Sequence, residues 1–190
     1  MPTIRQLSVY SQTALASYAI NLEPGGNNTS AYVADKVKMA VAQATEFNAA
    51  WDVLQQSTST INGFSAVLLQ NRTTGEKVLA IAGTDSASPA DWAADLGVFL
   101  NGSVANMDQY MALESFYSQL VTGNKLAAGE QITVTGHSLG GFLTQAFTAR
   151  HSDVVSTAYT FNAPGVGTAE LLAGYLEINR GQIPIFVQSA

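Results

Sequence analysis

Residues 132–143, which read I-T-V-T-G-H-S-L-G-G-F-L, contain the clearest candidate for chemistry. Ser138 stands between Gly136 and Gly140, after a β-branched run and before a helical pattern. A strand, a sharp turn and a helix in this order are typical of a nucleophile elbow, and the two glycines leave room for the tight bend. The turn also places the serine at a helix N-terminus, where N–H groups favour a developing oxyanion. We interpret Ser138 as a nucleophile rather than as an idle serine in a glycine-rich turn.

A serine hydroxyl needs a neighbouring base, and the sequence contains two histidines. His137 directly precedes the serine, so its side chain should point away from the hydroxyl. His151 follows the predicted helix, about 20 Å from Ser138 at about 1.5 Å per residue. We therefore expect both histidines to be packing or surface residues.

The elements that must position Ser138 follow from the alternation of apolar patterns. After the serine region we predict a helix over 139–150, a strand over 155–161, a helix over 168–177 and a strand over 183–187, with the strand before the serine over 131–136. Strands separated by helices of this length indicate a parallel sheet.

The N-terminal half is predicted to be helical first and then to form a hairpin. The patterns indicate helices over 4–20 and 31–55, antiparallel strands over 64–70 and 77–83, a short helix over 92–99 and a helix over 104–121. We expect one α/β domain over 1–190, with a mostly parallel sheet, flanking helices and an N-terminal β-hairpin.

Composition excludes several kinds of partner. The net charge of −6 and the scattered Lys and Arg residues argue against nucleic acid. No window is apolar enough for stable membrane insertion. The chain has no cysteine, and two histidines make a metal centre improbable, so no cofactor is implied.

Three motifs in order resemble the class 3, fungal-type lipases and their bacterial relatives, which have the α/β-hydrolase fold. They are A-G-T-D-S with D-W-A-A-D-L, then G-H-S-L-G-G, then T-F-N-A-P-G-V-G, between about residues 64 and 167. The resemblance implies Ser138 as nucleophile, with Leu139 and Thr84 as the N–H donors of the oxyanion hole. It also implies that Asp95 steadies the Thr84 hydroxyl and that Trp92 lies beside a lid. The arginine usual before Gly-Thr is replaced here by Ala82.

Alternatives remain for the acidic residues. Asp85 and Asp91 are better interpreted as helix-capping acids, and Asp95 is equally compatible with either role. After Ser138, the acids Asp153, Glu170 and Glu177 all fall in or beside helical patterns, whereas the triad acid of this fold ends a later strand. We therefore expect the triad acid and base to lie outside this chain, which would be incomplete at its C-terminus.

The sequence thus predicts a serine esterase or lipase that cleaves carboxylic esters through an acyl-enzyme, with an ester or lipid substrate. The alternative is a non-catalytic module that keeps the hydrolase scaffold for binding. The last strand would leave an apolar sheet edge that favours self-association. Location is open, although the resemblance is compatible with a secreted protein that has no cleaved N-terminal leader.

Overall fold

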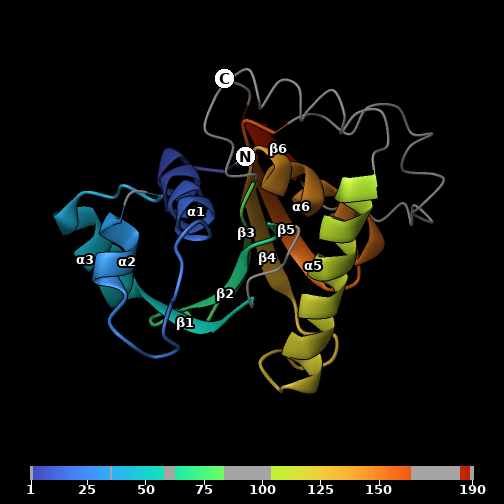
Figure 1. The fold of residues 1–190 in the computed structure, drawn as a ribbon, viewed down its shortest axis with the longest axis horizontal. Helices are drawn as coiled ribbons and strands as arrows, with labels where there is room; N and C mark the ends of the chain where they lie inside the picture. Colours follow the sequence, from blue (N-terminus) through green and yellow to red (C-terminus); the bar gives the residue numbers. More distant parts are fainter. Residues whose placement is uncertain (1, 35, 58–62, 84–103, 164–184, 189–190) are drawn as a thin grey trace.

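A mixed β-sheet forms the centre of the computed structural model, which describes residues 2–34, 36–57, 63–83, 104–163 and 185–188. Within these residues the sheet has six strands, and their order in space is their order in the chain (Figure 1). They are β1 (Trp51–Gln56), β2 (Ala66–Asn71), β3 (Lys77–Ile81), β4 (Ile132–His137), β5 (Val155–Phe161) and β6 (Ile185–Gln188). The first three strands pair antiparallel, whereas β3 to β6 pair parallel. The predicted hairpin and parallel sheet are confirmed.

Helices cover both faces of this sheet. α1 (Ile4–Ala16), α2 (Thr29–Val33) and α3 (Val41–Ala50) lie on one side, and α5 (Val104–Thr122) and α6 (Leu139–Arg150) lie on the other (Figure 1). Successive strand residues point to opposite faces, so Val67 and Leu69 join the first core while Ala66 and Leu68 join the second. The sheet is therefore buried on both sides, as parallel strands require.

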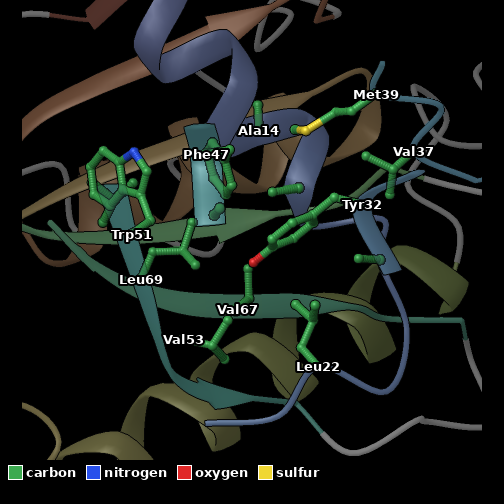
Figure 2. Packing of buried hydrophobic residues seen from close by; sticks show 14 of the residues in the cluster. Ala14, Leu22, Tyr32, Val37, Met39, Phe47, Trp51, Val53, Val67 and Leu69 are labelled. Carbon is green, nitrogen blue, oxygen red and sulfur yellow. The ribbon is translucent and has the colours of Figure 1, made fainter. Parts of the chain in front are cut away.

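The core on the α1–α3 side is rich in aromatic residues. Figure 2 shows Tyr32, Phe47 and Trp51 gathered over Val67 and Leu69. The rings of Tyr32 and Phe47 meet edge to face with centroids 5.0 Å apart. Burial of one large apolar side chain is worth about 1.5–3 kcal/mol, so this cluster holds α2 and α3 against the hairpin.

The predicted helix over 31–55 is wrong. The structure divides this segment into α2, α3 and the strand β1. Lys38 has φ 56°, which interrupts a right-handed helix, and Ala40 is extended immediately before α3. Trp51 and Val53 are buried in alternation because β1 pairs with β2, and this tertiary pairing overrides the helical spacing of the apolar residues.

The other predicted elements are confirmed wherever the structure describes them. α1 ends a turn earlier than predicted, and α5, α6 and β5 match their predicted ranges closely. The helices predicted over 92–99 and 168–177 lie outside the described residues. Among the described helices, none is both long and apolar enough to cross a membrane.

α1 is attached to the middle of the sheet. The ring of Tyr10 stacks on Tyr159 of β5 at 4.1 Å, and its hydroxyl donates to Glu76 at 2.8 Å. Thr135 of β4 donates to the Tyr10 carbonyl at 3.1 Å. These contacts fix the helix whose C-terminal end lies beside the candidate site.

Candidate active site

Ser138 occupies the turn between β4 and α6. Its backbone has φ 55° and ψ −127°, a conformation that residues with side chains seldom adopt. The Ser138 N–H donates to the Phe161 carbonyl at 3.0 Å, and the Ser138 carbonyl accepts from the N–H groups of Gly141 at 3.0 Å and Phe142 at 3.3 Å. Such strain costs on the order of 1–3 kcal/mol and persists where the surroundings impose it. The predicted elbow geometry is therefore present.

The glycines of the motif are required by close backbone contacts. A Cβ on Gly136 would collide with the backbone of Gly140, and a Cβ on Gly140 would collide with the Ile81 carbonyl and with Ala82. The first contact closes the turn on itself. The second brings the start of α6 against the end of β3.

The end of β3 therefore lies directly beside the serine. A Cβ on Gly83 would come within 3.1 Å of the Ser138 Cβ and within 2.8 Å of the His137 carbonyl. The chain after Gly83 starts at this edge, which is where the resemblance places the second oxyanion donor. Thr84 itself lies outside the described residues, as do Asp95, Asp85, Asp91 and Trp92.

Leu139 is brought to the site as the first residue of α6. An N–H in the first turn of a helix has no acceptor within that helix, so this one is available at the elbow. The helix dipole adds partial positive charge at the same point. Ser138 is buried, with 5% of its surface exposed, and charge–dipole interactions there are less screened than in water.

Solved structures of lipases have a fold similar to that of this chain. A lipase from Rhizopus microsporus var. chinensis matches with a TM-score of 0.61 and 19% identity, over 98% of this chain and 66% of that one. The Lip2 lipase from Yarrowia lipolytica matches with a TM-score of 0.55 and 16% identity, over 97% and 71%. A triacylglycerol lipase whose catalytic centre is described as a serine protease triad matches with a TM-score of 0.56 and 20% identity, over 86% and 64%.

The chain has the α/β-hydrolase fold. It spans about two-thirds of the length of these lipases. No family model matches the chain, and no curated protein matches it. At this level of identity the similarity establishes the fold, and the chemistry has to be argued from the site.

His137 is a packing residue at the end of β4. It is half-buried, and desolvation lowers the pKa of its imidazole. Its Nδ1 lies 3.0 Å from the hydroxyl of Tyr18, which follows the C-terminus of α1. Tyr18 also accepts a hydrogen bond from the Gly83 N–H at 3.0 Å.

His151 lies at the opposite end of α6 from Ser138. It caps the C-terminus of the helix, 13 residues after Ser138, which at about 1.5 Å per residue places it about 20 Å from the elbow. Its Nε2 lies 2.9 Å from both carboxylate oxygens of Glu114 on α5, and its ring stacks on Phe147. Its predicted remoteness from the serine is confirmed.

Sequence reasoning missed Tyr18. Its hydroxyl joins Gly83, just after β3, to His137, which directly precedes Ser138. Its position after a helix carries no local signal, because its two partners are distant in sequence. In the described part of the chain, no three His, Asp or Glu side chains form a group that could hold a metal ion.

Proposed function

We propose that the protein is a lipase-like serine hydrolase that cleaves carboxylic esters through an acyl-enzyme. The observation that carries this proposal is the strained backbone of Ser138 in a tight strand-to-helix turn, packed against the end of β3. A turn of this kind is costly, and it presents one hydroxyl beside backbone N–H groups at a helix N-terminus. The triacylglycerol lipase among the structural neighbours favours a lipid ester as substrate.

In this mechanism the Ser138 hydroxyl attacks the ester carbonyl while a base accepts its proton. The tetrahedral oxyanion is bound by the N–H groups of Leu139 and Thr84, and Asp95 orients Thr84. The base returns the proton to the departing alcohol, which leaves an acyl-serine. Water, activated by the same base, then releases the acid and restores the serine.

The base and the acid of this proposal come from outside the present chain. The sequence contains two histidines, and one is engaged by Tyr18 while the other is paired with Glu114 at the far end of α6. Of the acids after Ser138, Asp153 lies in the turn beyond α6, on the side of His151. A histidine and a carboxylate supplied by further sequence, or by a second chain, would complete the triad.

The proposal is tested by labelling the full gene product with a fluorophosphonate probe, which reacts fast only with an activated serine. Wild-type protein should be labelled at Ser138 and should hydrolyse p-nitrophenyl butyrate. Ser138→Ala should lose both, because the covalent route requires the hydroxyl. Ser118→Ala, which changes an exposed serine on α5, should retain both. Undiminished turnover by Ser138→Ala contradicts the assignment.

The proposed role of Asp95 is tested in the same assay. Loss of its carboxylate would leave one oxyanion donor misaimed, and a lost donor typically costs about 10²-fold or more in kcat. Asp95→Ala should therefore lower kcat much more than it raises KM. A change confined to KM would identify Asp95 as a helix-end acid.

A second candidate function is a binding module that uses the hydrolase scaffold without catalysis. The positions of His137 and His151 favour it, because neither can serve as the base. The two functions differ in the labelling experiment, since a module without a base leaves Ser138 unlabelled in the full gene product. If labelling appears only when a separate C-terminal fragment is added, a second chain supplies the base.

A further inference from the structure

We propose that Tyr18 is a positioning residue that sets the spacing between the two halves of the oxyanion hole. Its hydroxyl bridges Gly83 at the end of β3 and His137 at the end of β4. These residues directly precede Thr84 and Ser138 in the sequence. The inference rests on the proposed function and adds to it a residue that lies far from the hydrolase motifs.

The bridge joins one phenol oxygen to two groups. The oxygen accepts the Gly83 N–H at 3.0 Å, and Nδ1 of His137 lies 3.0 Å from the same oxygen. In a neutral imidazole, Nδ1 accepts the phenol proton when the ring proton is on Nε2 and donates to the phenol oxygen when the ring proton is on Nδ1. Either tautomer of His137 completes the bridge.

Tyr18 can hold these strand ends because its own backbone is fixed. The Ser65 side chain donates to the Ser17 carbonyl at 3.0 Å, and the Ser65 carbonyl accepts the Ala82 N–H at 2.9 Å. On the other side of Tyr18, Gln56 of β1 donates to the Ala19 carbonyl at 2.6 Å. The tyrosine is thus held from both sides by the sheet whose strand ends it spans.

The space around Gly83 shows how closely the three segments meet. A Cβ at this position would come within 2.8 Å of both the Tyr18 hydroxyl and the His137 carbonyl. Position 83 itself has no room for a side chain, so the contact comes from another segment of the chain. Tyr18, which follows the C-terminus of α1, supplies it.

This spacing matters because an oxyanion hole works only at short range. Its donors must lie about 2.7–3.1 Å from the position of the developing oxyanion. One donor starts α6, and the other follows β3. Without the bridge, the Gly83 N–H loses its acceptor and the two strand ends can separate, which weakens the binding of the transition state more than that of the substrate.

The test replaces Tyr18 by Phe in the full gene product, which removes the hydroxyl and keeps the ring. We expect kcat for p-nitrophenyl butyrate to fall about tenfold or more, with KM changed less than about twofold. The matched control is Tyr10→Phe, which removes a tyrosine hydroxyl from α1, the helix that Tyr18 follows; this hydroxyl donates to Glu76. The control should lower the melting temperature and leave kcat unchanged.

Two outcomes would overturn the proposal. One is an equal kcat for Tyr18→Phe and wild type, and the other is an equal loss of kcat in Tyr18→Phe and Tyr10→Phe.

A second measurement separates this inference from the proposed function. Nitrogen-15 NMR of the 190-residue chain reports the hydrogen bonding of the His137 ring, and Tyr18→Phe should shift both the ring nitrogens of His137 and the Gly83 amide. Failure of the fluorophosphonate to label wild-type protein would contradict the hydrolase while leaving the bridge open to this test. Unchanged NMR signals in Tyr18→Phe would contradict the bridge even in an active hydrolase.

Discussion

Gly140 is one of the two glycines of the elbow at which a side chain has no room. Its Cα faces the Ile81 carbonyl so closely that a methyl group has no room, and the atoms it would meet are backbone. Backbone atoms cannot turn aside as the end of a flexible side chain can. A substitution here must therefore separate α6 from β3 or distort the turn.

We predict that Gly140→Ala destabilises the fold by about 3 kcal/mol or more, because overpacking against backbone adds strain that rotamers cannot relieve. Gly75→Ala is the control. Gly75 has φ 75°, but a Cβ there meets no atom within 4 Å, so its cost should be about 1–2 kcal/mol from the backbone alone.

Chemical denaturation of both variants measures the difference. Equal losses of stability would mean that the contact between Gly140 and Ile81 is not close in solution. Loss of esterase activity in the folded fraction of Gly140→Ala would be a further consequence of a displaced elbow.

Residues of the candidate site could be predicted where the neighbouring sequence specifies them. Ser138, Gly136 and Gly140 lie within five consecutive positions, and the β-branched run and helical pattern beside them specify the turn. Tyr18 was not predictable, because it meets Gly83 and His137 across sequence separations of 65 and 119 residues. Nothing in the sequence near Tyr18 indicates those partners.

At the level of elements, periodicity predicted α5, α6, β4 and β5 well. These segments have one consistent pattern and clear boundaries. β1 was missed because the apolar residues before and within it also fit a helical spacing. Trp51 and Val53 alternate as a strand requires, yet this alternation is too short to outweigh the preceding helix pattern without knowledge of β2.

The α5–α6 contact contains a charged cluster around Glu114. Tyr110 donates to its carboxylate at 2.5 Å, His151 lies at 2.9 Å and Arg150 at 3.8 Å. Burial alone would raise the pKa of Glu114, but the hydrogen bonds with His151 and Tyr110 and the nearby positive charge outweigh it and lower the pKa. Because the folded-state pKa lies below the unfolded one, ionised Glu114 stabilises the fold above about pH 4.3.

We predict that Glu114→Gln lowers stability by about 1–2 kcal/mol at pH 7, since hydrogen bonds to a charged group are lost. The difference from wild type should shrink as the pH falls through the folded-state pKa, because protonation removes the same charge in the wild type. Urea denaturation between pH 7 and pH 3 measures it.

Glu46→Gln, at an exposed position on α3, should stay close to wild type across this range. A Glu114→Gln deficit that persists undiminished at low pH would show that the carboxylate contributes through packing rather than through its charge.

For the whole molecule, the fold follows from the order of elements, whereas the candidate site depends on contacts between residues that are distant in sequence. The helix and strand patterns were sufficient to predict a mostly parallel sheet with flanking helices. They could not predict how the end of β3 meets the elbow, because that contact depends on packing at Gly140 and Gly83.

We predict that these 190 residues alone hydrolyse p-nitrophenyl butyrate very slowly or not at all. A serine without a base retains only what the oxyanion hole and substrate binding supply, a small part of the full rate. Both histidines of the chain are held in other contacts. Steady-state assays of the purified chain and of its His151→Ala variant measure this. Full activity that His151→Ala eliminates would place the imidazole at Ser138, against the geometry of α6.

The order of strands in the sheet also bears on synthesis. The strands leave the ribosome in the order in which they stand side by side, so each described strand finds its neighbour already made. α1 is different, because it precedes all six strands in the chain and yet packs on β4 and β5. A nascent chain therefore carries part of the apolar face of α1 uncovered until residue 132 and those after it emerge. The Tyr18 hydroxyl meets His137 only when β4 is complete, so the elbow is held by a residue that is synthesised 119 positions before its partner.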